Sequence, residues 1–401
     1  MRRHYLRTHP QRLLPNDHGY SGRRAAAGVV VLAGSEEIPL SEPITIRVEL
    51  SERSYDIRIG RGILDQAGSF VADRLKGNHA VVITDENVRQ PHAENVAASL
   101  SSSGIRTETL VVPAGEETKS AEQAAALWNR LLELGADRKT LVVAVGGGVV
   151  GDLGGFVAAT YARGIPFVQV PTSLMAQVDS SVGGKVGINL PLAKNLVGAF
   201  WQPAGVLIDL AALDTLPVRE YRSGLAEVVK YGVILDAAFF EYLETHIPEI
   251  NGRDNTVLTH LIRRSCELKA QVVSQDEHEE TGLRAVLNYG HTFCHPIETV
   301  SGYGNYLHGE AVAIGMVRAS RLAELVGRIG SDLTLRQEKL LNALGLPTAM
   351  SGLDIEALMI AMHRDKKAEH GRLRFVLPSR MGHVELVGGI DAELVRRAWQ
   401  L

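Results

Sequence analysis

Residues Leu141–Asp152 read LVVAVGGGVVGD, and this stretch decides the fold. An apolar, mostly β-branched run leads directly into Gly146, Gly147 and Gly148, after which the pattern predicts a helix. Glycines between a buried strand and a helix let the backbone approach a pyrophosphate closely. The stretch lacks the GxGxxG spacing, so a tight turn is the alternative; the strand before it and the helix after it favour a nucleotide. Asp152 either caps this helix or accepts a hydrogen bond from a ribose or nicotinamide group.

Before and after this stretch, short β-branched runs alternate with helical patterns such as Ala121 to Leu134. The runs that we predict as strands are 80–84, 110–113, 141–145, 167–170 and 206–209. This alternation is typical of an α/β domain with a doubly wound, mostly parallel, Rossmann-like sheet. Before it, alternating apolar residues over 44–48 and 55–59 predict a β-hairpin. Ligands of such sheets bind at the carboxyl ends of the strands, where the candidate residues are Asp85, Asn87, Glu116 and Lys119.

The chain of 401 residues is long enough for two domains after an N-terminal extension. We expect an arginine-rich, disordered extension over 1–43, a nucleotide-binding α/β domain over 44–215, and a mainly α-helical domain over 216–401. The formal net charge of -4 argues against nucleic-acid binding, and the apolar run at 25–34 is too short to span a membrane. The two cysteines, Cys266 and Cys294, form no CxxC motif, which fits a reducing cytoplasm.

Four polar residues between 280 and 310 are spaced as on one face of a helix: Arg284, Asn288, His291 and His295. A guanidinium, an amide and two imidazoles make a poor core, so this face is expected to line a polar site. A further histidine follows at His308. Together with one carboxylate, His291 and His308 would form a Zn²⁺ site that leaves a position open for substrate. Glu227 is the leading carboxylate, and Lys230 faces the same cavity. An ordinary i,i+3 ion pair between these two is the alternative. Cys294, beside His295, is expected to point away from the polar face and so not to act as a nucleophile.

Cationic side chains are unusually frequent around the expected cleft. The segment 160–202 is rich in Gly, Ser, Asn and Lys and is expected to form loops that line it, with Asn195 among its polar residues. Lys185 and Lys194 stand among glycines and apolar residues and are candidate phosphate or cofactor contacts. The full cationic set suits a substrate with both a phosphate and a carboxylate: Arg163, Lys185, Lys230, Lys269 and Arg284.

Glu280 is a candidate acid/base or partner of these cations, and His295 is a candidate proton carrier. One of Lys366 and Lys367 is expected to reach the cleft, with Lys366 preferred.

Over about residues 44–401 the chain closely resembles the 3-dehydroquinate synthase family of the shikimate pathway. The motifs that carry the resemblance are TDENV, PAGEETK, GGGVVGD, TYARGIPFVQVPTSLMAQVDSSVGGKVGINLP, KNLVGAFWQP, AEVVKYG, ETGLRAVLNYGHTF, LHGEAV and DKK. The resemblance implies the family's fold, a cytoplasmic homodimer, NAD⁺, and a Zn²⁺ or Co²⁺ ion held by Glu227, His291 and His308. It implies the cofactor contacts Asp85, Asn87, Glu116, Lys119, Gly147, Gly148, Val149, Asp152, Thr172, Ser173, Asp179, Lys185, Lys194, Leu213 and Thr215.

The family converts 3-deoxy-D-arabino-heptulosonate 7-phosphate into 3-dehydroquinate and phosphate, and its substrate contacts can be carried over by position. They are Arg163, Lys185, Asn195, Lys230, Lys269, Arg284, Asn288, His295 and Lys366. Of these, Lys185, Lys230, Arg284, Asn288 and His295 are expected to take part in catalysis, together with Glu280. The alternatives are a related sugar phosphate cyclase, of the amino-dehydroquinate or epi-valiolone type, and a metal-dependent alcohol dehydrogenase resembling glycerol dehydrogenase.

Three features depart from the family pattern. The run QDEHEETGLR is one residue longer than the shortest family versions, so the choice between Glu279 and Glu280 beside Arg284 stays open. Pro296 follows His295 where a small residue is usual, and is expected to kink the helix there. The extension over 1–43 has no family counterpart.

Overall fold

The computed structural model describes residues 42–74, 77–191, 193–302, 304–364 and 373–401. Most of the expected N-terminal extension, and also Lys366 and Lys367, lie outside the described residues. The described residues all fall within one compact unit, so the domain boundary near residue 216 stays a prediction. None of the described helices is long and apolar enough to cross a membrane.

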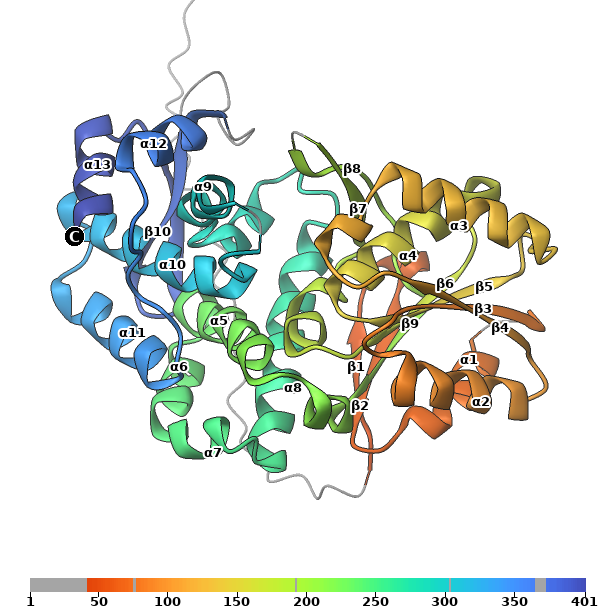
Figure 1. Ribbon diagram of the computed structural model, residues 1–401. Helices are drawn as coiled ribbons and strands as arrows, with labels where there is room; N and C mark the ends of the chain where they lie inside the picture. Colours follow the sequence, from red (N-terminus) through yellow and green to blue (C-terminus); the bar gives the residue numbers. More distant parts are fainter. Residues whose placement is uncertain (1–41, 75–76, 192, 303, 365–372) are drawn as a thin grey trace, which may run out of the picture. The chain divides into compact units, whose positions relative to one another are not determined.

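A seven-stranded sheet forms the first part of the fold (Figure 1). Its strands are β1 (Ile44–Val48), β2 (Tyr55–Gly60), β3 (His79–Asp85), β4 (Arg106–Val112), β5 (Leu141–Gly146), β6 (Phe167–Pro171) and β9 (Gly205–Asp209). The order across the sheet is β1-β2-β9-β6-β5-β3-β4. Only β1 runs antiparallel, paired with β2, and all other neighbours are parallel. The predicted hairpin, the predicted strands and the parallel sheet are therefore confirmed.

Helices cover both faces of this sheet (Figure 1). They are α1 (Ala67–Ala72) and α2 (Glu94–Ser102) on one face, and α3 (Ala121–Glu133) and α4 (Gly148–Thr160) on the other. Successive side chains of β5 alternate between the two cores: Val142 and Ala144 pack with α3 and α4, whereas Val143 and Val145 pack with α1 and α2. A strand buried on both faces must be continuously apolar, which is why LVVAV was informative.

The segment 160–202 contains more regular structure than the expected loops. It includes a two-stranded antiparallel hairpin, β7 (Lys185–Leu190) and β8 (Ala193–Phe200). The hairpin packs on α4 at Gly155, where an added Cβ would lie 2.4 Å from Cγ1 of Val186. The expectation of loops was wrong here because glycines weaken the sequence signal of a strand.

Helices dominate after residue 217 and gather beside the sheet (Figure 1). They are α5 (Val218–Leu235), α6 (Ala237–Thr245), α7 (Ile247–Asn251), α8 (Asn255–Gln275), α9 (His291–Ser301), α10 (His308–Leu325), α11 (Ser331–Ala343), α12 (Ile355–Arg364) and α13 (Ala392–Gln400). The expected return to strand near 373–377 is a pair, β10 (Arg374–Arg380) and β11 (His383–Gly388). Gly309 lets α10 approach α5, since a Cβ there would lie 1.9 Å from the carbonyl oxygen of Ser223.

The helix predicted through Arg284, Asn288, His291 and His295 is wrong in its first half. Residues Leu283–Asn288 form a 3₁₀ helix, η8, and α9 begins only at His291. The break is at Gly290, which has a φ of +82° and packs so closely on α10 that a Cβ would lie 2.9 Å from the amide nitrogen of Met316. Of the four residues, only His291 and His295 therefore lie on an α-helix. α9 is assigned continuously across the buried Pro296.

Candidate active site

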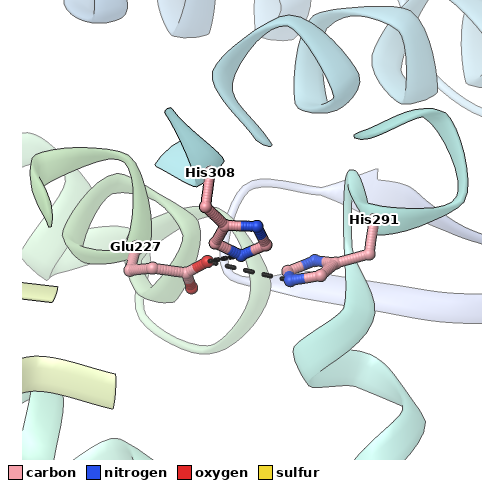
Figure 2. Close-up of side chains that lie close together, drawn as sticks. All are labelled: Glu227, His291 and His308. Atoms are coloured by element: carbon pink, nitrogen blue, oxygen red, sulfur yellow. Dashed lines mark ion pairs between the residues drawn. The ribbon is translucent and has the colours of Figure 1, made fainter. Parts of the chain in front are cut away.

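Three side chains suited to bind a metal ion converge from three helices (Figure 2). Glu227 lies in the middle of α5, whereas His291 and His308 are the first residues of α9 and α10. Nε2 of each histidine lies 3.8 Å from Oε1 of Glu227. Glu227 is completely buried, and within the described part of the chain its Oε1 receives no hydrogen bond. A buried carboxylate oxygen that faces two imidazole nitrogens fits a divalent cation. That the three residues bind one stays a prediction.

A network of buried charges lies next to Glu227. Oε2 of Glu227 contacts Nζ of Lys230, one helical turn further along α5. Nζ of Lys269 and the hydroxyl of Tyr231 each donate to Oδ1 of Asp179 over 2.7 Å. Burial lowers the pKa of Lys230, but the carboxylates of Glu227 and Asp179 raise it above its ordinary value. Burial likewise opposes ionisation of Asp179, but Lys269 and Lys230 hold its pKa well below the ordinary range. The ammonium group of Lys230 is therefore held beside the candidate metal ligands.

A second carboxylate lies behind His308, on the side away from Glu227. Oε1 of Glu298, on α9, lies 3.3 Å from Nδ1 of His308 and 3.3 Å from Nζ of Lys194. Burial raises the pKa of Glu298, but the hydrogen bond with His308 and the nearby positive charges lower it to about 2. Sγ of Cys294 lies 3.9 Å from Nδ1 of His308. The expectation that Cys294 points away from the polar residues was wrong in this respect, because α10 packs on that side of α9.

Lys119 joins the glycine-rich turn to the β7–β8 hairpin. Its Nζ donates to Oδ2 of Asp152 over 2.6 Å and to Oδ1 of Asn195 over 2.5 Å. Burial lowers the pKa of Lys119, but Asp152 and Glu116 raise it above its ordinary value. Asp152 does not cap α4, because Gly147 occupies the N-cap position. The carboxylate is thus part of a polar cluster at the carboxyl edge of the sheet.

Other predicted cofactor contacts lie at or just beyond the ends of neighbouring strands. Asp85 ends β3, and its Oδ1 accepts a hydrogen bond from the amide of Asn87. The amide of Thr172 donates to the carbonyl of Gly146 over 2.9 Å, so β5 and β6 end together.

An added Cβ at Gly147 would lie 3.4 Å from Oγ of Ser173, and one at Gly148 would lie 3.2 Å from Oγ of Ser180. Val149 lies in the first turn of α4. Beyond β9, Thr215 bonds to His92 over 2.8 Å, whereas the side chain of Leu213 is buried in the core.

The structure places Glu279, and not the predicted Glu280, against the cationic residues. The carboxylate of Glu279 contacts Nζ of Lys185 and lies 3.8 Å from Nε of Arg284. Arg284 is buried, and its guanidinium donates to the carbonyls of Gly183 and Glu277. Glu279 has a φ of +60°, a conformation that few residues other than glycine adopt. The left-handed turn at Glu279 thus accompanies an orientation of its carboxylate toward Lys185 and Arg284.

Three further predicted substrate contacts are His295, Asn288 and Arg163. His295 lies near the candidate metal ligands, with its ring centroid 5.7 Å from that of His291. Asn288 is half-buried in η8, and Arg163 is exposed with a φ of +70°. Sequence reasoning missed Glu298, although it continues the 4-and-3 spacing of His291 and His295 along α9.

Comparison with solved structures first indicates a class of enzyme, the sugar phosphate cyclases. The chain is similar to the solved structure of 2-deoxy-scyllo-inosose synthase complexed with carbaglucose-6-phosphate, NAD⁺ and Co²⁺. The identity is 27% and the TM-score 0.82, over 89% of this chain and 99% of that one. It is also similar to 2-epi-5-epi-valiolone synthase from Streptomyces hygroscopicus subsp. jinggangensis with NAD⁺ and Zn²⁺ bound. Here the identity is 28% and the TM-score 0.80, over 88% of this chain and 97% of that one.

Within this class, sequence similarity identifies the family. The 3-dehydroquinate synthase N-terminal model matches residues 109–223, and the 3-dehydroquinate synthase C-terminal model matches residues 224–368. The 3-dehydroquinate synthase of Rhodopirellula baltica is 49% identical over 363 residues, which cover 89% of this chain and 97% of the relative. The chain belongs to the 3-dehydroquinate synthase family.

Proposed function

We propose that this protein is a 3-dehydroquinate synthase that converts 3-deoxy-D-arabino-heptulosonate 7-phosphate into 3-dehydroquinate and phosphate. The reaction comprises transient oxidation, phosphate elimination, reduction, ring opening and aldol closure. The observation that carries the proposal is the convergence of Glu227, His291 and His308 next to buried cations, in a chain that belongs to this family. A simple alcohol dehydrogenase has no need for that cationic set.

The cofactor and the metal would occupy adjoining parts of the site. Glu227, His291 and His308 would hold Zn²⁺ or Co²⁺, which lowers the pKa of a bound hydroxyl, and NAD⁺ accepts and returns a hydride. Glycines 146–148 leave room for the backbone to meet a pyrophosphate at the N-terminus of α4. Asp152, held by Lys119, is an acceptor for a hydroxyl or amide of the dinucleotide.

The cations would bind and orient the two anionic groups of the substrate. Lys185 and Arg284 already contact a carboxylate, that of Glu279, so the geometry accommodates an anion between them. Lys230 lies next to the candidate metal ligands and would stabilise negative charge that develops on the oxygen of the newly formed carbonyl group. His295, near His291, would carry a proton, and the bound phosphate can itself accept one during elimination. Positioning and charge stabilisation are then the main contributions of the protein.

Two further properties follow from family membership alone. We propose that the protein acts in the cytoplasm and that it forms a homodimer. Size-exclusion chromatography with light scattering would test the second property, and a single species with the mass of one chain would contradict it.

A comparison of substrates tests the proposed specificity. Wild-type protein with NAD⁺ and Zn²⁺ would be given either the heptulosonate phosphate or a heptulose 7-phosphate that lacks the carboxylate. One hydrogen-bonded charge contact is worth about 1.5–3 kcal/mol, so we expect a preference in kcat/KM of at least about tenfold for the carboxylate-bearing sugar. In the Asn288→Ala variant this preference should shrink, because Asn288, with Arg284 and His295, is among the residues that favour a carboxylate-bearing substrate. Faster turnover of the carboxylate-free sugar would assign the protein to another sugar phosphate cyclase activity.

A further inference from the structure

We propose that Glu298 is a positioning residue that fixes the orientation of His308 in the metal centre and couples that centre to Lys194. The inference rests on the proposed function, because it requires a metal ion at Glu227, His291 and His308. Glu298 does not contact the substrate or the metal ligand atoms in this scheme. It acts through the imidazole of His308.

The first step of the argument concerns the two nitrogens of His308. A neutral imidazole binds a metal through one nitrogen and carries its proton on the other. Nδ1 of His308 lies 3.3 Å from Oε1 of Glu298, and an ionised carboxylate only accepts hydrogen bonds. Glu298 therefore selects the form of His308 with the proton on Nδ1. The lone pair is then on Nε2, the atom that lies 3.8 Å from Oε1 of Glu227.

The second step concerns what holds the ring in place. The side chain of His308 is 40% exposed, so packing encloses the imidazole only in part, whereas Glu298 is only 6% exposed. Glu298 lies two turns after His291 on α9, so one helix supplies a metal ligand and the acceptor that orients another ligand. α9 and α10 are closely packed, because a Cβ at Gly315 would lie 2.3 Å from the carbonyl oxygen of Gly290. The hydrogen bond thus joins two rigid elements.

The third step concerns Lys194 on β8. Its Nζ lies 3.3 Å from the same Oε1 that faces His308, so the ammonium and the imidazole share one acceptor oxygen. Lys194 is a predicted contact of the cofactor or of phosphate. A ligand that draws Lys194 away leaves more of the carboxylate charge to His308, which makes this ring a stronger metal ligand. Binding of a ligand to Lys194 and the metal affinity of the site are thereby linked.

Metal affinity, and not activity, is the direct test. Zn²⁺ dissociation constants would be measured by chelator competition for wild type, Glu298→Gln and Glu298→Ala, with the absorption spectrum of the Co²⁺ form as a measure of coordination geometry. Loss of a partner of this kind weakens metal binding by about 10–100-fold, and we expect Gln near the lower and Ala near the upper end. Glu324→Gln is the control, because Glu324 lies at the far end of α10 and pairs with Arg321. Its metal affinity should equal that of wild type.

The outcomes separate this inference from the proposed function. If wild type binds no Zn²⁺, the metal assignment and this inference are both wrong. If wild type binds Zn²⁺ and Glu298→Gln binds it equally tightly with an unchanged Co²⁺ spectrum, only this inference fails. A lower unfolding temperature of the metal-free Gln variant without loss of metal affinity would make Glu298 a purely structural residue.

A double-mutant comparison tests the coupling to Lys194. Lys194→Met should strengthen Zn²⁺ binding in the wild-type background, since it removes the competing cation. The same change should have no effect in the Glu298→Gln background. Equal effects in both backgrounds would refute the coupling.

Discussion

Replacing Glu227 by Gln should separate metal binding from nucleotide binding and reveal the cost of an unpaired buried ammonium. Glu227 is completely buried, its Oε1 faces two histidines, and its Oε2 contacts Lys230, whose side chain is 2% exposed. The amide keeps the size of the side chain but removes its charge. Removing one member of a buried ion pair typically costs about 3–5 kcal/mol. Because Asp179 still attracts Lys230 and the amide oxygen can still accept its hydrogen bond, we expect a loss of about 3 kcal/mol in the metal-free protein.

Urea unfolding of the metal-free proteins measures this loss, and chelator competition measures Zn²⁺ affinity. The Glu227→Gln, Lys230→Met double variant is the matched control, because removing both charges should recover much of the stability. NAD⁺ affinity should stay close to that of wild type in all of these proteins. Wild-type Zn²⁺ affinity in Glu227→Gln would refute Glu227 as a ligand. Unchanged metal-free stability would refute the argument from the buried pair.

Three further outcomes follow from the site. His308→Ala should bind Zn²⁺ far more weakly and lose activity, while NAD⁺ affinity measured by calorimetry changes little; retained metal and activity would remove His308 from the ligand set. Lys119→Met leaves the half-buried Asp152 without its ion-pair partner and should weaken NAD⁺ binding by about tenfold, whereas undiminished affinity would contradict the place of Lys119 in the cofactor site. Burial raises the pKa of Asp276, but two backbone amides that donate to its carboxylate lower it below the ordinary value. Its contribution to stability is therefore complete above the unfolded-state pKa of about 3.9 and is lost as the pH falls further, so wild type should lose unfolding free energy more steeply than Asp276→Asn below about pH 4.

The sheet was predictable because its strands must be apolar on both faces, and the run LVVAV before three glycines meets that requirement at every position. The β7–β8 hairpin was not predictable. Glycines and polar residues interrupt both of its strands, and its position depends on contact with α4 at Gly155, which is a property of the folded chain. Gly290 is a local signal for the helix break, but the close approach of α10 to this glycine is a property of the folded chain.

The candidate site was predictable where chemistry limits the choice of residue. A carboxylate is a common third ligand beside two histidines, and Glu227 stands in a largely apolar part of its helix, so the three could be grouped without knowing the fold. The choice between Glu279 and Glu280 depended on the conformation of the loop before Arg284. Spacing along the chain does not determine that geometry, and the left-handed turn at Glu279 does.

Phosphate release under limiting NAD⁺ tests the central claim most directly. Purified protein with Zn²⁺ and NAD⁺ far below the substrate concentration would be given 3-deoxy-D-arabino-heptulosonate 7-phosphate, with the product identified by mass spectrometry and NADH followed by absorbance. A cyclase that oxidises and then reduces its substrate should release phosphate well beyond the amount of NAD⁺, form 3-dehydroquinate and accumulate no net NADH. Phosphate release that stops at the amount of NAD⁺, or NADH that accumulates with product, would contradict the account.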